Sequence, residues 1–132
     1  MAYDVYGETF GDIYEVILAA VHLDDEETFR AYIKECDING KNSFGWTPLH
    51  MTARYGRANL CEILLDAGAS IDPTDANGWT PLMEAIMQGH TNVAELLLKR
   101  GADPHIQSAM GDSVVTLAHK CDVKELLDSM QV

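Results

Sequence analysis

Apolar positions fall into paired helical segments that short polar stretches separate at regular intervals. Thr47 and Pro48 precede one apolar stripe, at residues 48–55. A Thr side chain accepts a hydrogen bond from the first amides of a helix, and Pro suits the first helical position because no N–H is needed there. Gly56 interrupts the stripe, and a second apolar segment follows at 58–66. The pattern predicts two helices, over 48–55 and 58–66, with a glycine break between them.

The same pattern returns 33 residues later. Gly-Trp-Thr-Pro-Leu begins at Gly45 and again at Gly78, and a third turn glycine, Gly111, keeps the same spacing. The segments 60–69 and 93–102 also align, and both end in Gly-Ala. A unit of this length cannot bury its apolar face alone, so neighbouring units stack and share a core. The spacing predicts two closely matched repeats.

The flanking units are less regular. Residues 13–23 predict an inner helix without the Thr-Pro entry, and the acidic run 24–27 precedes a helix that carries Phe29. Acids near a helix N-terminus favour the helix dipole, so we interpret this run as a cap with a solvated face. At the other end, Ser113-Val114 replaces Thr-Pro. Terminal repeats present one face to water, which relaxes the pattern.

A period of 33 residues with Thr-Pro-Leu-His at 47–50 is typical of ankyrin repeats. The chain resembles that family over almost its whole length. The resemblance implies an all-α fold, a solenoid of about four helix–turn–helix repeats with short hairpin turns, capped at both ends and therefore complete. Within a single domain, 1–132, we expect an N-terminal arm, an N-terminal capping repeat, two regular repeats and a C-terminal capping repeat, at 1–12, 13–41, 42–74, 75–107 and 108–132.

The resemblance also implies a function. In this family the hairpin tips and inner helices line a concave groove whose residues vary with the protein partner. We therefore expect a non-enzymatic protein–protein interaction module with Trp46, Tyr55 and Trp79 at the centre of its site. Aromatic residues and Met, which are enriched in interface cores, are common in the expected site. The expected partner-binding residues are Phe44, Trp46, Arg54, Tyr55, Asn77, Trp79, Met87, Gln88, Met110 and Asp112.

Two alternatives to this site remain open. Trp commonly follows the turn glycine in this family, so Trp46 and Trp79 are also interpreted as rings that lie on the adjacent turn and stiffen the hairpins. In the second alternative, the partner binds the convex face. The resemblance further implies that His50 ties neighbouring turns together by hydrogen bonds rather than serving as a metal ligand or a catalytic group.

Charge narrows the class of partner. The chain has 21 Asp and Glu against 9 Lys and Arg, a formal net charge of −12. Such a chain is repelled by nucleic acid and by anionic membranes, and no run reaches the roughly 18 apolar residues of a membrane span. The charge fits ordinary solubility and also favours a basic protein partner. A second functional hypothesis is therefore a small acidic inhibitor, of the immunity or antitoxin type, that neutralises a basic toxic enzyme.

No catalytic, cofactor or metal site is expected. Cys36, Cys61 and Cys121 lack the spacing of a disulfide framework, and we interpret them as free thiols in the reducing cytoplasm. His119 and Cys121 alone are too few ligands for zinc, which takes four. The glycines follow no predicted strand, so they are turn glycines rather than a phosphate loop. We expect a cytoplasmic monomer.

Overall fold

A computed structural model describes residues 13–120, which form seven helices and no strands. The expected N-terminal arm, Cys121 and the rest of the C-terminal capping repeat lie outside the described residues. None of the described helices is long and apolar enough to cross a membrane. In chain order the helices are α2 (Ile13–Leu23), α3 (Glu26–Ile33), α4 (Pro48–Arg54), α5 (Ala58–Asp66), α6 (Pro81–Met87), α7 (Thr91–Lys99) and α8 (Val114–Lys120).

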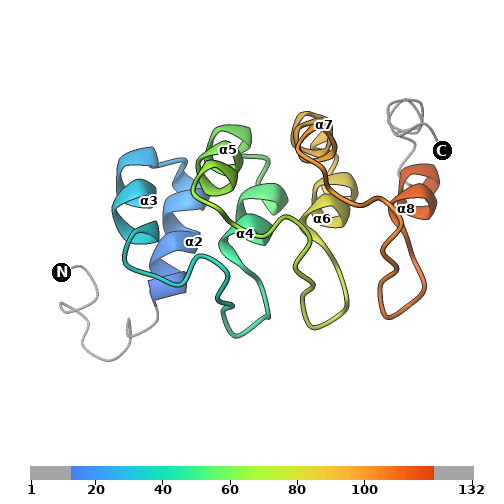
Figure 1. The fold of residues 1–132 in the computed structure, drawn as a ribbon, viewed down its shortest axis with the longest axis horizontal. Helices are drawn as coiled ribbons and strands as arrows, with labels where there is room; N and C mark the ends of the chain where they lie inside the picture. The colour runs from blue at the N-terminus through green and yellow to red at the C-terminus, as the bar shows by residue number, and fades with distance from the viewer. Residues whose placement is uncertain (1–12, 121–132) are drawn as a thin grey trace.

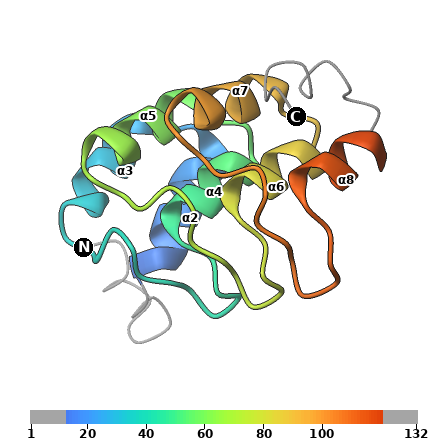
Figure 2. The same ribbon diagram turned by 45° about the vertical axis from the view of Figure 1, so that its right-hand side comes forward.

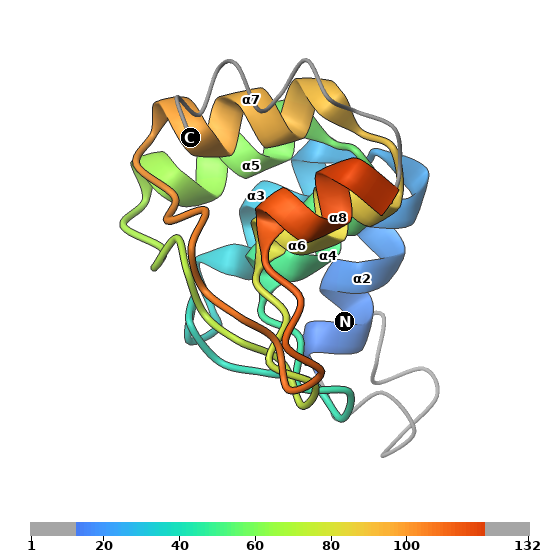
Figure 3. The same ribbon diagram turned by 90° about the vertical axis from the view of Figure 1, so that its right-hand side faces the viewer.

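The helices stack in two rows (Figure 1). Helices α2, α4, α6 and α8 lie side by side in an inner row, and α3, α5 and α7 form an outer row above it. Three hairpin loops project from the inner row on the side away from the outer helices (Figure 2). A view along the stack shows these loops one behind another (Figure 3). The described residues therefore form the all-α solenoid that the sequence predicts.

The helix starts follow the predicted capping chemistry. Thr47 Oγ1 accepts a hydrogen bond from the backbone N–H of His50 at 3.3 Å, and Thr80 Oγ1 accepts one from Met83 at the same distance. Asp25 caps α3 in the same way, which confirms the acidic run as a cap. Helices α2 and α5 coincide with the predicted ranges, whereas α4 ends one residue before its predicted end.

All three hairpins close through one arrangement that sequence reasoning missed. A side-chain oxygen at the first turn position accepts hydrogen bonds from the backbone N–H groups two and four residues later. Asn42, Asp75 and Ser108 supply these oxygens, at donor–acceptor distances between 2.9 and 3.3 Å. Gly45 has a φ of +82°, and a Cβ on it would lie 2.9 Å from the backbone nitrogen of Ala76 in the next hairpin. Glycine therefore permits both the turn and the close stacking of hairpins.

A single apolar core runs through the stack, from Ile17 in α2 to Leu117 in α8. Leu64 and Leu97, which are 33 residues apart on the outer helices, are both fully buried. Cys61 is fully buried as well and donates its S–H to Thr52 Oγ1 at 3.0 Å. Burial raises the pKa of the Cys61 thiol to about 12, so this sulfur is a packed neutral group and no nucleophile.

Candidate partner-binding groove

A pocket of about 370 Å³ opens between the hairpins and the inner helices α4 and α6. It occupies the region where the resemblance places the concave groove. All the predicted partner-binding residues except Phe44, Tyr55 and Asp112 line it. The complete lining is Trp46, Arg54, Asp75, Asn77, Trp79, Glu84, Met87, Gln88, Ala109 and Met110.

The three remaining predicted residues lie around the pocket at different distances from its centre. Phe44 stacks against Trp46, with 5.0 Å between ring centroids, and is 60% exposed at the hairpin tip. Asp112 closes the third hairpin through its backbone, where its carbonyl accepts a hydrogen bond from Ser108 at 2.7 Å. Tyr55 instead packs edge-on against His22 of α2, at 5.3 Å. The structure thus brings the two Trp rings to one pocket and places Tyr55 beside α2.

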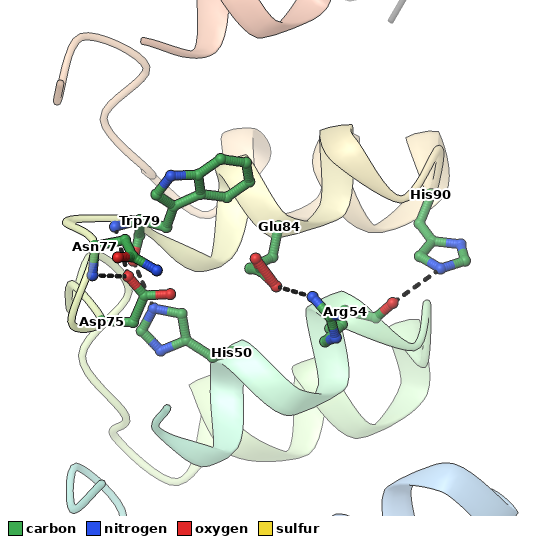
Figure 4. Close-up of polar contacts among 7 residues, drawn as sticks. All are labelled: His50, Arg54, Asp75, Asn77, Trp79, Glu84 and His90. Atoms are coloured by element: carbon green, nitrogen blue, oxygen red, sulfur yellow. Dashed lines mark hydrogen bonds and ion pairs between the residues drawn. The ribbon is translucent and has the colours of Figure 1, made fainter. Parts of the chain in front are cut away.

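Two lining residues from neighbouring inner helices form an ion pair (Figure 4). Arg54 of α4 donates from Nη1 to Glu84 Oε2 of α6 at 2.9 Å. The guanidinium of Arg54 also lies over the ring of Trp46, with its Cζ 5.0 Å from the centroid. A cation over an indole face is attracted by the ring quadrupole. Trp46, Arg54 and Glu84 therefore form one connected group.

Glu84 is the most unusual residue of the pocket, and sequence reasoning missed it. It is only 5% exposed, and burial raises the pKa of its carboxyl while the hydrogen bond from Arg54 opposes that shift. The equivalent position one repeat earlier holds Met51, which is fully buried. The sequence did contain a signal for this residue, because the matched repeat has an apolar Met at the position of Glu84. Buried charges are unfavourable for stability, and they gather at functional sites more often than elsewhere.

His50 ties two successive hairpins together, as the resemblance implies. Its Nδ1 accepts a hydrogen bond from the backbone N–H of Thr47 at 3.1 Å, and its Nε2 donates to the carbonyl of Trp79 at 2.7 Å (Figure 4). These partners fix the neutral tautomer with its proton on Nε2. A second hydrogen bond between neighbouring repeats was not predicted: His90 Nε2 donates to the carbonyl of Arg54 at 3.1 Å. The backbone around the pocket is therefore held by both histidines.

The buried His50 predicts a loss of stability on acidification. Burial lowers its pKa below the usual 6.5, and the hydrogen bond to Trp79 only partly offsets this. The unfolded state therefore takes up a proton first, and stability falls as pH drops below 6.5, by at most about 1.4 kcal/mol per pH unit. Met83 holds the equivalent position in the next repeat, so His50→Met should remain folded and lose this slope. Denaturant unfolding of both proteins between about pH 5 and 7 measures the difference, and identical slopes would contradict the assignment.

No group of three or more His, Cys, Asp or Glu between residues 13 and 120 is arranged to hold a metal ion. Cys36 is half-buried, and burial raises the pKa of its thiol. The pocket between the hairpins is thus the feature that best fits a binding role.

Comparisons with known proteins agree with this architecture. The family model described as ankyrin repeats, in three copies, matches residues 16–108. The 60 kDa lysophospholipase of Mus musculus is 42% identical over 52 residues. This match covers 39% of the present chain and 9% of the mouse protein. The similarity is therefore confined to a short segment of that protein, far less than two thirds of its length.

Proposed function

The chain belongs to the ankyrin repeat family, and from this premise we propose that it binds a protein partner through the pocket between its hairpins and inner helices. Ankyrin repeats are generally protein–protein interaction modules. The proposed unit is one non-enzymatic, monomeric domain, 1–132, with an N-terminal arm and with capping and regular repeats divided as the sequence predicts. A cytoplasmic location is part of the same proposal.

One observation carries this proposal: the exposed large apolar side chains gather at the pocket. Phe44, Met87 and Met110 are 60%, 42% and 85% exposed, and within residues 13–120 only Leu23 is comparable elsewhere. Two of the three stand on hairpin tips, and the half-buried rings of Trp46 and Trp79 lie between them. Apolar surface gathered in one place and rimmed by polar groups is typical of protein interaction sites. This distribution supports the groove over the convex face.

Alanine variants of the two Trp residues test this proposal. Trp46→Ala and Trp79→Ala should each weaken binding of the partner by about 2 kcal/mol or more, because large rings in a central pocket exclude water and lose little entropy on binding. As controls, Glu62→Ala and Glu95→Ala on the exposed side of the outer helices should change the binding free energy by less than about 0.5 kcal/mol. Affinity capture from the native cell with mass spectrometry supplies the partner, and calorimetry with the purified pair measures the affinity.

The melting temperatures of the same variants separate the alternatives. If the two Trp rings only stiffen the hairpins, their variants melt earlier but bind the partner normally. If the Glu variants abolish binding and the Trp variants do not, the partner occupies the convex face. Either outcome removes the groove proposal.

The net charge of −12 supports a second candidate, an acidic inhibitor that covers a basic toxic enzyme. Charge steering would speed the association of such a pair at low salt, and screening would slow it as salt rises. An acidic partner, or an association rate that is indifferent to salt, would exclude this candidate and leave the general binding proposal intact.

A further inference from the structure

On the premise of the proposed binding function, we propose that the pocket receives the guanidinium group of an arginine that the partner presents between apolar residues. The proposal names the chemistry of the partner at the pocket already described. Three features of the pocket support it: carboxylate oxygens to which no described residue donates, aromatic walls and a net negative charge.

Two carboxylate oxygens of the pocket accept no hydrogen bond from the described residues, and neither is sealed away from solvent. The side chain of Glu84 is almost completely buried, and Arg54 donates a hydrogen bond only to its Oε2. Its other oxygen, Oε1, accepts no hydrogen bond from the described residues, and neither does Oδ2 of Asp75, whose Oδ1 takes two backbone N–H groups. Figure 4 shows Glu84 directed from α6 toward Arg54, with Asp75 on the neighbouring hairpin. A carboxylate oxygen accepts up to two hydrogen bonds, so a guanidinium with five N–H donors suits these acceptors.

The walls of the pocket suit the same group. The guanidinium of Arg54 already lies over Trp46, which shows that the pocket accommodates such a contact. One repeat later, Met87 stands in the place of Arg54, and no described cation lies over Trp79. Indole faces attract cations, and arginine stacks on them more readily than lysine because it is planar and weakly hydrated. A volume of about 370 Å³ leaves room for a long side chain.

The carboxylates of the lining disfavour both an anionic and a purely apolar occupant. Two carboxylates, Asp75 and Glu84, face a single cation, Arg54, so the lining has a formal charge of −1. An anionic group would be repelled by this lining. A purely apolar group would seal the unpaired oxygen of Glu84 away from water, which is unfavourable. The exposed Met87 and Met110 at the rim favour apolar residues on either side of the arginine.

A matched pair of tripeptides tests the inference. The probe is acetyl-Leu-Arg-Leu-amide, and its control carries citrulline, which keeps the shape of arginine but has no charge. The indole N–H signals of Trp46 and Trp79, assigned with Trp46→Phe and Trp79→Phe, report binding by NMR. The arginine peptide should shift both signals and saturate in the millimolar range, whereas the citrulline peptide should bind at least about tenfold more weakly.

Two conservative variants identify the acceptors. Asp75→Asn should fold, because Asn42 closes the previous hairpin in the same way. Glu84→Gln keeps an oxygen for Arg54. Each variant should bind the arginine peptide about tenfold more weakly than the wild-type protein. The control, Glu95→Gln on the exposed side of α7, should bind it unchanged, and an unaltered NMR spectrum elsewhere shows that each variant is folded.

Three results would overturn the inference: equal binding of the citrulline peptide, unchanged binding by Glu84→Gln, or no shift with peptide at about 10 mM. None of these would by itself remove the binding proposal, which depends on the Trp46→Ala and Trp79→Ala variants against the protein partner. If Trp46→Ala and Trp79→Ala weaken binding of the partner and Glu84→Gln does not, the groove binds the partner without an arginine in this pocket.

Discussion

Replacing Leu64 or Leu97 by alanine should lower the free energy of unfolding by about 2–5 kcal/mol. Both side chains are fully buried in the core that all seven described helices share. Each truncation removes apolar contacts from this core and leaves a cavity that the surrounding helices fill only in part. Because neighbouring repeats share this core, either change should destabilise the whole domain.

Urea unfolding followed by circular dichroism measures this effect. Wild type and both variants should unfold in one transition, with a lower midpoint and an unchanged slope for the variants. Leu23→Ala is the matched control, because Leu23 is 72% exposed and its loss should change stability by less than about 0.5 kcal/mol. Two separate transitions, of which each variant moves only one, would contradict a solenoid that folds as a unit.

Local chemistry made most of the fold predictable from the sequence. Thr47 and Thr80 cap helices whichever tertiary partner they have, and the turn glycines mark positions that other residues adopt only with strain. The hairpin closures were harder to predict, because Asn42, Asp75 and Ser108 share no side-chain type. What they share is a side-chain oxygen that reaches the backbone N–H groups two and four residues later, and this became visible only with the turns in place.

The lining of the pocket was predictable only where the position of a residue within the repeat decides its place. Trp46, Trp79 and Met87 line the pocket because the hairpin and the inner helix place them there. Tyr55 satisfies the same positional rule, but its neighbour His22 belongs to α2, so its contact depends on how two helices pack. Glu84 was not predicted as a pocket residue, because its position on α6 belongs to the apolar stripe that faces the core. The charge of Glu84 is compensated there by Arg54, which reaches it from the neighbouring inner helix α4.

The ion pair in the pocket leads to the last prediction. Arg54→Met should destabilise the domain by about 3 kcal/mol at neutral pH, because it leaves the carboxylate of Glu84 buried without its partner. We expect the lower end of the usual range, since the side chain of Arg54 is 36% exposed. Met is the chosen substitute for Arg54, because Met87 occupies the equivalent position in the next repeat.

A second methionine should rescue this variant. Glu84→Met follows the precedent of the buried Met51, and the double variant should return to within about 1 kcal/mol of wild type, because a packed apolar pair replaces a buried ion pair at little cost. A double-mutant cycle in urea measures the coupling.

The pH dependence of Arg54→Met supplies an independent check. Burial raises the pKa of Glu84 above 4.5, so its ionisation penalises the folded state increasingly as pH rises from 4.5 through the folded-state pKa. The defect of Arg54→Met should therefore be largest at neutral pH and shrink as pH falls toward 4.5. If the defect is independent of pH, or if Glu84→Met fails to relieve it, then the stability of the domain depends on the stacking of Arg54 on Trp46 and not on the buried charge of Glu84.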